Sequence, residues 1–307
     1  MSTGLPVSRP APGLPGEPSG SPGSGVRAPR RAPRRRILAA TLALCGVLVM
    51  LYPPAASWWA ESTAAGRLAV HAEQNRSLDP AARSALLTAA EDYNATRVTG
   101  LVVDPFSNVE GADAHGIDDD ARDYLAQLAH DPEGIMARVR VPGIDVDLPV
   151  YHGATEETLR RGSGHLYGSS LPVGGPGTHA VLTGHSGLPE AKLFTAVHDL
   201  RAGDDVFIDV LDRTLAYRVT GAEVVEPTDV AGLAVRPGED LLTLVTCTPI
   251  GVNSHRLIVH AERVDLPDGG APPEPSRPFP WWAVLAVVAV LAWAATVLAP
   301  AGQPRRH

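Results

Sequence analysis

Two uncharged apolar segments constrain the fold of this chain more than any other sequence feature. They cover residues 37–56 and 281–299, and each is about 20 residues long. A helix of that length spans the hydrocarbon core of a lipid bilayer, which is roughly 30 Å thick. Tryptophan pairs stand at residues 58–59 and 281–282, as is typical of chains that cross a membrane interface. We therefore expect two transmembrane helices, with the lipid bilayer as a partner.

Two other interpretations of these segments fit the sequence less well. A cleaved signal peptide has an apolar core of about 7–15 residues close to the N-terminus. The first segment is longer, begins at residue 37 and is followed by two bulky tryptophans. The second segment could be a buried core helix, but it follows a proline-rich stretch at residues 267–280. Retained membrane helices are therefore the favoured interpretation of both.

The charge distribution predicts how the chain is oriented. Residues 1–36 contain seven arginines and one acidic residue, and the C-terminal tail contains Arg305 and Arg306. Because positively charged flanks stay in the cytoplasm, both termini should be cytoplasmic and the segment between the two spans extracellular. That segment, residues 57–279, has 17 basic and 33 acidic residues. Nucleic acid is not expected as a partner, because phosphate binding needs clustered Lys and Arg.

Composition and breaks in periodicity divide the chain into segments. Residues 1–36 are rich in Pro, Gly, Ser and Arg and are expected to be a disordered cytoplasmic tail. The other expected segments are a transmembrane helix at 37–56, a helical segment at 57–98, a loop at 99–116, a folded domain at 117–266, a linker at 267–280, a transmembrane helix at 281–299 and a cytoplasmic tail at 300–307.

The folded domain has the pattern of a mainly β structure. From Ile135 onwards, seven short stretches of alternating apolar and polar residues are separated by Gly, Pro, Asp and Asn. Many short strands with turn residues between them predict a closed barrel or a sandwich. Helical patterns precede this region at Asp118–Ala129 and interrupt it near Glu156–Arg161 and Glu190–Leu200.

The chain has two cysteines, and only one lies in the extracellular segment. Cys45 is inside the first apolar segment and Cys247 ends the strand pattern TLVTC, so no disulfide between them is expected. Pro249 follows closely, and proline cannot continue a central ladder. The thiol of Cys247 is therefore expected at the end of a strand, where a substrate can reach it. The alternative is a buried, unreactive cysteine, which is the common fate of an isolated thiol.

A histidine and an arginine are also predicted at strand ends. His185 lies in LTGHSGL between two glycines, although His165 and His179 are nearby alternatives and a surface turn is also possible. Arg256 begins the pattern HRLIVHAERV, nine residues after Cys247. A strand that ends at Cys247 and a returning strand would form a hairpin that brings Arg256 near the thiol; alternatively, Arg256 is a solvated residue at a strand end.

Cysteine, histidine and arginine together can perform acyl transfer. Cysteine attacks a carbonyl as its thiolate, and its unperturbed pKa is about 8.5. A nearby histidine can exchange that proton and later protonate a leaving amine. A guanidinium can stabilise the oxyanion that forms in between.

These residues carry a close resemblance to a known family. LTGHSGL, TLVTCTPIGVNSHRL and VPGIDVDLPVYHG resemble the sortases, in which a histidine precedes a TLxTC cysteine and an arginine follows about nine residues later. The resemblance implies an eight-stranded sortase barrel at 117–266, with Cys247 as nucleophile, His185 as acid and base, and Arg256 as oxyanion or substrate stabiliser. It implies cleavage of an LPXTG-like signal between Thr and Gly through a thioester, followed by transfer to an amine. No cofactor and no metal are implied.

Further features resemble class C, the pilus-assembling sortases. Asp104-Pro105-Phe106 resembles the lid motif of that class, which makes 99–116 the expected lid loop, although Asp-Pro is also a common turn opener. The C-terminal apolar segment and the run YHGATEETLRRGSGHLYGSSLPVGGPGTHAVLTGH are also similar. Class C implies a pilin lysine as the acceptor amine. Candidate residues of the substrate groove are Thr243, Thr246 and Ser186, where relatives often have Arg in place of Ser186.

Three alternatives are weighed against a class C sortase. A housekeeping sortase would attach LPXTG-bearing surface proteins to the cell-wall precursor, and the lid motif argues against it. An L,D-transpeptidase would have a tighter SHGC-like cluster, which this sequence lacks. A non-catalytic membrane adhesin would bury Cys247 as an unreactive thiol.

Overall fold

A computed structural model describes residues 32–98, 119–188, 193–267, 270 and 279–299. The elements in chain order are α1 (Ala32–Ser77), α2 (Pro80–Thr96), α3 (Asp119–Ala126), β1 (Ile135–Val141), η1 (Pro142–Ile144), β2 (Val146–His152), α4 (Glu156–Arg161), β3 (Ser163–His165), β4 (Thr178–Thr183), η2 (Thr195–Asp199), β5 (Asp205–Val210), β6 (Arg213–Val225), η3 (Ala231–Leu233), β7 (Asp240–Thr248), β8 (His255–Val264) and α5 (Trp281–Leu298).

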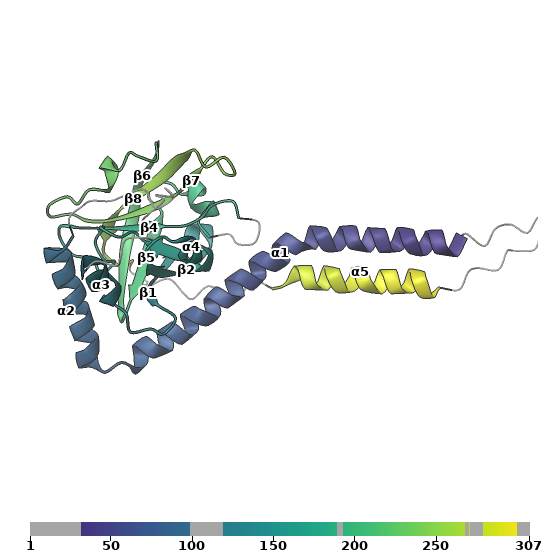
Figure 1. Ribbon diagram of the computed structural model, residues 1–307, viewed down its shortest axis with the longest axis horizontal. Coiled ribbons are helices and arrows are strands. Elements are labelled where there is room, and N and C mark those ends of the chain that lie inside the picture. Colours follow the sequence, from purple (N-terminus) through teal and green to yellow (C-terminus); the bar gives the residue numbers. More distant parts are fainter. Residues whose placement is uncertain (1–31, 99–118, 189–192, 268–269, 271–278, 300–307) are drawn as a thin grey trace, which may run out of the picture.

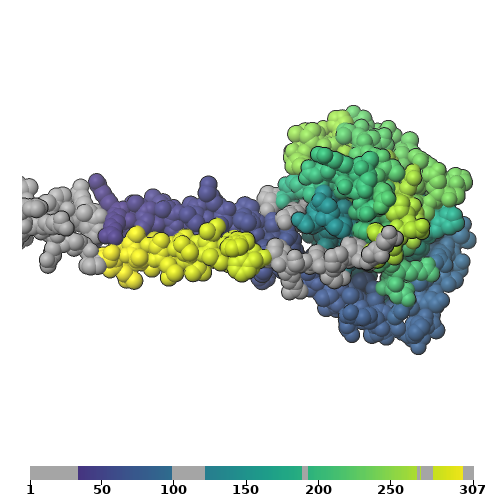
Figure 2. Space-filling view, turned by 180° about the vertical axis from the view of Figure 1, so that it is seen from behind, coloured from purple at the N-terminus to yellow at the C-terminus, as the bar shows by residue number. Residues whose placement is uncertain are grey.

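Two long apolar helices lie side by side and extend away from the rest of the protein (Figures 1 and 2). α1 and α5 are long and apolar enough to cross a membrane. They are joined near one end by an edge-to-face contact of Trp58 and Trp282, with ring centroids 5.9 Å apart. Within the paired region, Nε1 of Trp293 donates a hydrogen bond of 3.1 Å to Oγ1 of Thr41. The two apolar segments therefore form a helical pair.

The first helix continues well beyond the boundary expected at residue 56. α1 runs without interruption from Ala32 to Ser77 and includes Pro53 and Pro54. The segment expected at 57–98 is thus the end of α1 followed by α2. Local sequence explains the break between them: the Asp79 side chain accepts a hydrogen bond from the amide of Ala81 at 2.7 Å, and Pro80 occupies the first turn of α2. Both features start a new helix.

Eight strands form a closed barrel in the order β1-β2-β3-β4-β7-β8-β6-β5, which confirms the predicted architecture. Strands β2 and β3 are parallel, as are β4 and β7, and the other neighbours are antiparallel. Strand β3 has only three residues and was not among the seven patterns, because three residues are too few to show alternation. The helix expected near Glu190–Leu200 is a short 3₁₀ helix, η2, within the described residues.

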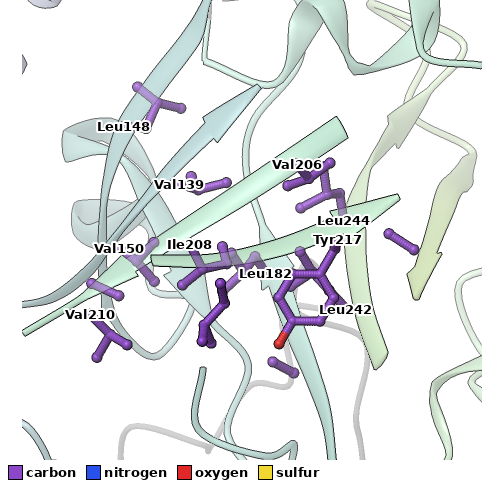
Figure 3. Packing of buried hydrophobic residues seen from close by; sticks show 14 of the residues in the cluster. Val139, Leu148, Val150, Leu182, Val206, Ile208, Val210, Tyr217, Leu242 and Leu244 are labelled. Carbon is purple, nitrogen blue, oxygen red and sulfur yellow. The ribbon is translucent and has the colours of Figure 1, made fainter. Parts of the chain in front are cut away.

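The inside of the barrel is filled by apolar side chains from all around the sheet (Figure 3). Leu182, Leu242 and Leu244 are completely buried there. Strands β4 and β7 supply these three side chains from alternate positions, so the intervening residues of both strands point to the outer face of the barrel. Full burial of such a side chain typically contributes about 1.5–3 kcal/mol. The core thus fixes which side chains these two strands present on the outside.

A buried polar network joins α3 to the barrel. The hydroxyl of Tyr124 donates to His165, with 2.9 Å to the ring Nδ1, and accepts from the amide of Gly153 at 2.9 Å. Nε2 of His165 donates to the carbonyl of Ser170 at 2.8 Å. Both ring nitrogens therefore have partners that suit the neutral imidazole. Burial lowers the pKa of His165 from 6.5 to about 4, because desolvation disfavours the charged ring.

His165 is expected to make the folded state sensitive to acid. Its pKa is depressed by folding, so the unfolded chain takes up the proton first, and stability falls as the pH drops from 6.5 to about 4. The total loss is about 3 kcal/mol, at roughly 1.4 kcal/mol per unit. Chemical denaturation across this range should show a shallower acid slope in His165→Gln than in the parent. Equal slopes in His165→Gln and parent would contradict this assignment.

Candidate active site

Cys247 is the penultimate residue of β7, as the sequence predicted for a thiol at a strand end. After Thr248 the chain turns at Pro249, whose carbonyl accepts hydrogen bonds from the amides of Val252 and Asn253 at 3.0 and 2.9 Å. The residue is 6% exposed. Cys247 is therefore held at the end of the barrel, before a hydrogen-bonded turn, and is largely shielded from solvent.

Arg256 lies directly across the ladder from Cys247. The two residues are paired in the antiparallel register of β7 and β8, which confirms the predicted hairpin. Nη1 of Arg256 donates to the carbonyls of Asn253 and His255 at 3.1 and 3.2 Å, and the residue is 7% exposed. The loop between the strands thus binds one side of the guanidinium and holds it at the cysteine end of the sheet.

His185 is brought to the same end of the barrel by the strand parallel to β7. It follows β4 by two residues, and both of its neighbours bind β7: the amide of Gly184 donates to the carbonyl of Val245 at 3.2 Å. On the other side, Oγ of Ser186 donates to the carbonyl of Cys247 at 2.7 Å. The histidine backbone is therefore fixed beside the cysteine backbone.

The two glycines that flank His185 each allow a close approach. A Cβ on Gly184 would lie 2.7 Å from the ring of Phe194, whose amide donates to the carbonyl of His185 at 3.0 Å. Gly187 has a φ of +75°, and a Cβ there would lie 2.5 Å from Cγ2 of Ile250. The histidine loop is thus packed between η2 and the β7–β8 turn, and substitution of either glycine would displace it.

Glu156 is a partner of His185 that the sequence did not reveal. Its Oε2 lies 3.1 Å from Nε2 of the imidazole, and the histidine side chain is 19% exposed. A carboxylate beside Nε2 orients the imidazole ring, and Nδ1 then lies on the side of the ring away from Glu156. Glu156 opens α4, 29 residues before His185, and only the pairing of β3 with β4 brings the two regions together.

The two histidines that compete with His185 in the sequence have other partners. His165 is bound within the network of Tyr124. His179 is 1% exposed, and its Nε2 lies 2.7 Å from Oγ1 of Thr243. His165 on β3 pairs with Leu182, and His179 on β4 pairs with Leu241 at the start of β7. Neither histidine therefore lies at the level of Cys247 in the sheet.

The three groove candidates donate or accept hydrogen bonds inside the protein. Oγ1 of Thr246 donates to the carbonyl of Gly184 at 2.7 Å, Ser186 binds the backbone of Cys247 as described, and Thr243 lies between two histidines. Their role in substrate binding stays a prediction. The expected lid residues Asp104, Pro105 and Phe106 lie outside the described residues.

A separate hollow of about 1030 Å³ lies at the opposite end of the barrel. Its charged lining includes Arg263, whose Nη1 is 3.3 Å from Oδ2 of Asp240, and none of the described lining residues is a cysteine or histidine. Within the described part of the chain, no three His, Cys, Asp or Glu side chains come together as a metal site would require. Asp240 begins β7 and Cys247 lies near its end, so the hollow and the thiol are at opposite ends of the same strand.

Comparisons with known proteins agree with this geometry. A model of the sortase domain matches residues 139–264. Sortase A of Bacillus anthracis is 30% identical over 155 residues, which are 50% of this chain and 72% of that protein. The crystal structure of sortase C-1 from Actinomyces oris is 43% identical with a TM-score of 0.55, and the match covers 60% of this chain and 99% of that one.

A third relative is described as the pilus-related sortase C of Group B Streptococcus. It is 35% identical with a TM-score of 0.56, over 63% of this chain and 94% of that chain. The match to Sortase A of B. anthracis and the near-complete coverage of the two solved structures indicate the same family. The chain belongs to the sortase family of cysteine transpeptidases, and its structural neighbours include sortases C.

Proposed function

We propose that this protein joins pilin subunits by cleaving an LPXTG-like sorting signal and transferring its acyl group to a pilin lysine. The observation that carries the proposal is the pairing of Cys247 with Arg256 across β7 and β8, with the backbone of His185 held beside Cys247 just after β4. The pilus-related sortase C among the relatives supports a pilin substrate over other surface proteins.

The proposed reaction has two acyl transfers. The thiolate Sγ of Cys247 attacks the Thr carbonyl carbon, and the guanidinium of Arg256 stabilises the oxyanion. The C–N bond to Gly then breaks, and the departing amine takes a proton from His185, leaving a thioester. A lysine amine attacks the thioester, gives up a proton to His185, and forms an isopeptide bond as the thiolate leaves.

The membrane helices support a site at the outer surface of the cell. We infer that α1 and α5 span the bilayer as a pair, with the basic ends of the chain in the cytoplasm. The barrel would then face the sorting signals and acceptor amines of secreted proteins. A reporter fused to either terminus should be accessible from the cytoplasm only.

The acceptor assay distinguishes the proposed activity from its alternative. Full-length protein in detergent micelles is incubated with an LPXTG peptide and either a lysine-bearing pilin peptide or an amine that mimics the cell-wall precursor, and products are measured by mass spectrometry. An isopeptide product with lysine supports pilus assembly. A product with the precursor mimic alone would favour a housekeeping sortase, and no cleavage even with hydroxylamine would contradict transpeptidation.

A further inference from the structure

His185 follows β4, and the two neighbours of β4 in the barrel bring different residues to it. In the order of the sheet, β3 is on one side of β4 and β7 is on the other. Cys247 belongs to β7, whereas Glu156 is the first residue of α4, which packs against β2 and β3. The carboxylate and the cysteine therefore come to His185 from opposite sides of its strand.

Close packing fixes α4 on the β3 side. Leu159 of this helix is 2% exposed. A Cβ on Gly164 of β3 would lie 3.1 Å from Cδ2 of Leu159 and 2.3 Å from the carbonyl oxygen of Gly153. The guanidinium carbon of Arg161 lies 4.6 Å from the ring centroid of Tyr151 on β2. A buried leucine, a strand residue without a side chain and a stacked arginine thus anchor a helix of only six residues.

The first turn of α4 holds the carboxylate of Glu156 between two partners. The side chain of Thr155 accepts a hydrogen bond from the amide of Thr158 at 3.2 Å, which caps the helix. Oε1 of Glu156 accepts from Nε of Arg160 at 2.9 Å. Oε2 lies 3.1 Å from Nε2 of His185. One oxygen is therefore bound to its own helix and the other contacts the active site.

The contact between Glu156 and His185 determines where the imidazole carries a proton. An ionised carboxylate accepts hydrogen bonds and donates none. Nε2 of His185 must therefore carry a proton in this contact, whether the ring is neutral or charged. In the neutral ring this is the single proton, so Nδ1 has the lone pair. Glu156 thus selects one of the two neutral tautomers, and the selection does not depend on the charge of the ring.

Nδ1 is the nitrogen on the side of the ring away from Glu156 and α4. That side is the β7 side in the order of the sheet, where both neighbours of His185 bind the backbone of β7. The amide of Gly184 donates to the carbonyl of Val245 at 3.2 Å, and Oγ of Ser186 donates to the carbonyl of Cys247 at 2.7 Å. The nitrogen with the lone pair is therefore the one directed toward the strand that carries the thiol.

We propose that Glu156 is a positioning residue that keeps a proton on Nε2 of His185 and so makes Nδ1 the nitrogen that exchanges protons during acyl transfer. Nδ1–H of the imidazolium gives its proton to the departing glycine amine. The ring is then neutral, and Nδ1 uses its lone pair to take a proton from the attacking lysine amine, which restores the imidazolium. Glu156 itself gains no proton in either step.

The two acyl transfers depend on this tautomer to different extents. In the first transfer the imidazolium carries protons on both nitrogens, so no tautomer has to be selected. In the second transfer the neutral ring must have its lone pair on Nδ1 to act as a base. Removal of the Glu156 carboxylate is therefore expected to slow lysine attack on the thioester more than it slows formation of the thioester. This kinetic effect rests on the proposed function, whereas the position of the proton does not.

Nuclear magnetic resonance of the imidazole tests the position of the proton without any substrate. Couplings between the ring carbon protons and isotope-labelled ring nitrogens distinguish the two neutral tautomers, and a His185→Gln variant identifies the signals of His185. Full-length protein in micelles is measured at about pH 8.5, above the usual charge change of histidine. The parent should carry the proton on Nε2, and Glu156→Ala should show a larger fraction with the proton on Nδ1. A parent ring with its proton on Nδ1, or an unchanged tautomer ratio in Glu156→Ala, would overturn the proposal.

Single-turnover kinetics test the role in catalysis. Thioester formation with an LPXTG peptide and its decay with a lysine-bearing peptide are followed by intact-mass spectrometry. In Glu156→Ala the decay should be about tenfold slower, a part of the 10²–10⁴-fold that general acid–base catalysis typically supplies. Thioester formation should change at most about threefold, so the acyl adduct should accumulate during steady turnover. Equal slowing of both steps, or a decay at the parent rate, would overturn the positioning role.

Glu157→Ala is the matched control for this substitution. Glu157 is the next residue of α4 and belongs to the same acidic first turn. Because adjacent helix residues do not face the same way, its removal takes the same charge from the same turn but not the contact with His185. Both kinetic steps should stay within about twofold of the parent, and both variants should unfold at similar temperatures. Equal slowing of thioester decay in Glu156→Ala and Glu157→Ala would overturn the proposal.

Formate provides a further check, because it carries a carboxylate small enough to replace the one that Glu156→Ala removes. Formate should restore part of the lost decay rate in Glu156→Ala and leave the parent unchanged, while chloride at the same ionic strength should restore none. Equal effects of formate and chloride would overturn the positioning role. If the parent forms no thioester with the LPXTG peptide, the proposed function fails, but the tautomer measurement still decides whether Glu156 sets the proton of His185.

Discussion

Replacement of Cys247 by alanine is expected to abolish transpeptidation, with a fall of at least about 10³-fold in product formation, as is usual when a covalent nucleophile is removed. No other residue can form the thioester with the sorting signal in this mechanism. Intact-mass spectrometry of the full-length protein in micelles should show an acyl adduct in the parent and none in Cys247→Ala. Residual product at more than a few per cent of the parent rate would contradict a role for this thiol.

The fold of the variant and the second cysteine provide the controls. Loss of one sulfur atom at a site that is 6% exposed should cost on the order of 1 kcal/mol of stability, so thermal unfolding should remain cooperative and close to that of the parent. Cys45 lies on α1, where it is exposed in the isolated chain. Cys45→Ala should keep the acyl adduct and the full rate. Loss of the adduct in this variant would mean that Cys45, and not Cys247, is the nucleophile.

Sequence reasoning predicted the part of the site that depends on adjacent strands. Cys247 and Arg256 are nine residues apart on a hairpin, and the alternation of both strands together with Pro249 indicated where the turn lies. The ladder pairs them as expected. The neighbourhood of His185 was suggested by its glycines, because close approach needs residues without a side chain, and these glycines meet Phe194 and Ile250.

Features that depend on register across several strands could not be predicted in the same way. Glu156 meets His185 only because β2, β3 and β4 are neighbours. The hydrogen bonds that link His179, Thr243, His260 and Glu223 draw on β4, β7, β8 and β6. A shift of one residue in any of these strands would turn its side chain to the other face. Histidines at such positions show no periodic signal, so the sequence suggested His179 only as an alternative to His185.

Segment length and apolar composition predicted that the two long helices exist, but not where the first one ends. The apolar segment at 37–56 indicated a membrane helix, and the structure continues it to Ser77 as α1. The polar residues after Trp59 favour helix as strongly as the apolar ones before it. Hydropathy therefore identifies the stretch that suits lipid, while the end of the helix is set by the cap at Asp79 and by Pro80.

Replacement of Arg256 by lysine is expected to lower kcat/KM for the LPXTG peptide by about 10²–10³-fold, the usual effect of losing one oxyanion donor. Lysine keeps the positive charge but has a single ammonium group. It cannot bind the carbonyls of Asn253 and His255 with one nitrogen while presenting a second donor to the oxyanion, as a guanidinium can. Alkylation of Cys247 by a small reagent should stay within about twofold of the parent rate, because that reaction passes through no oxyanion.

A second arginine of β8 supplies the matched control for this substitution. Arg263 lies near the other end of the strand, with its guanidinium 5.6 Å from the ring centroid of Tyr217 and 3.3 Å from Asp240. Arg263→Lys should therefore change stability but leave kcat/KM within about twofold, since it is outside the proposed mechanism. Equal losses of activity in Arg256→Lys and Arg263→Lys would mean that Arg256 stabilises the barrel and does not stabilise the oxyanion. A loss confined to Arg256→Lys, with normal thiol alkylation, would assign the guanidinium to the acyl-transfer step itself.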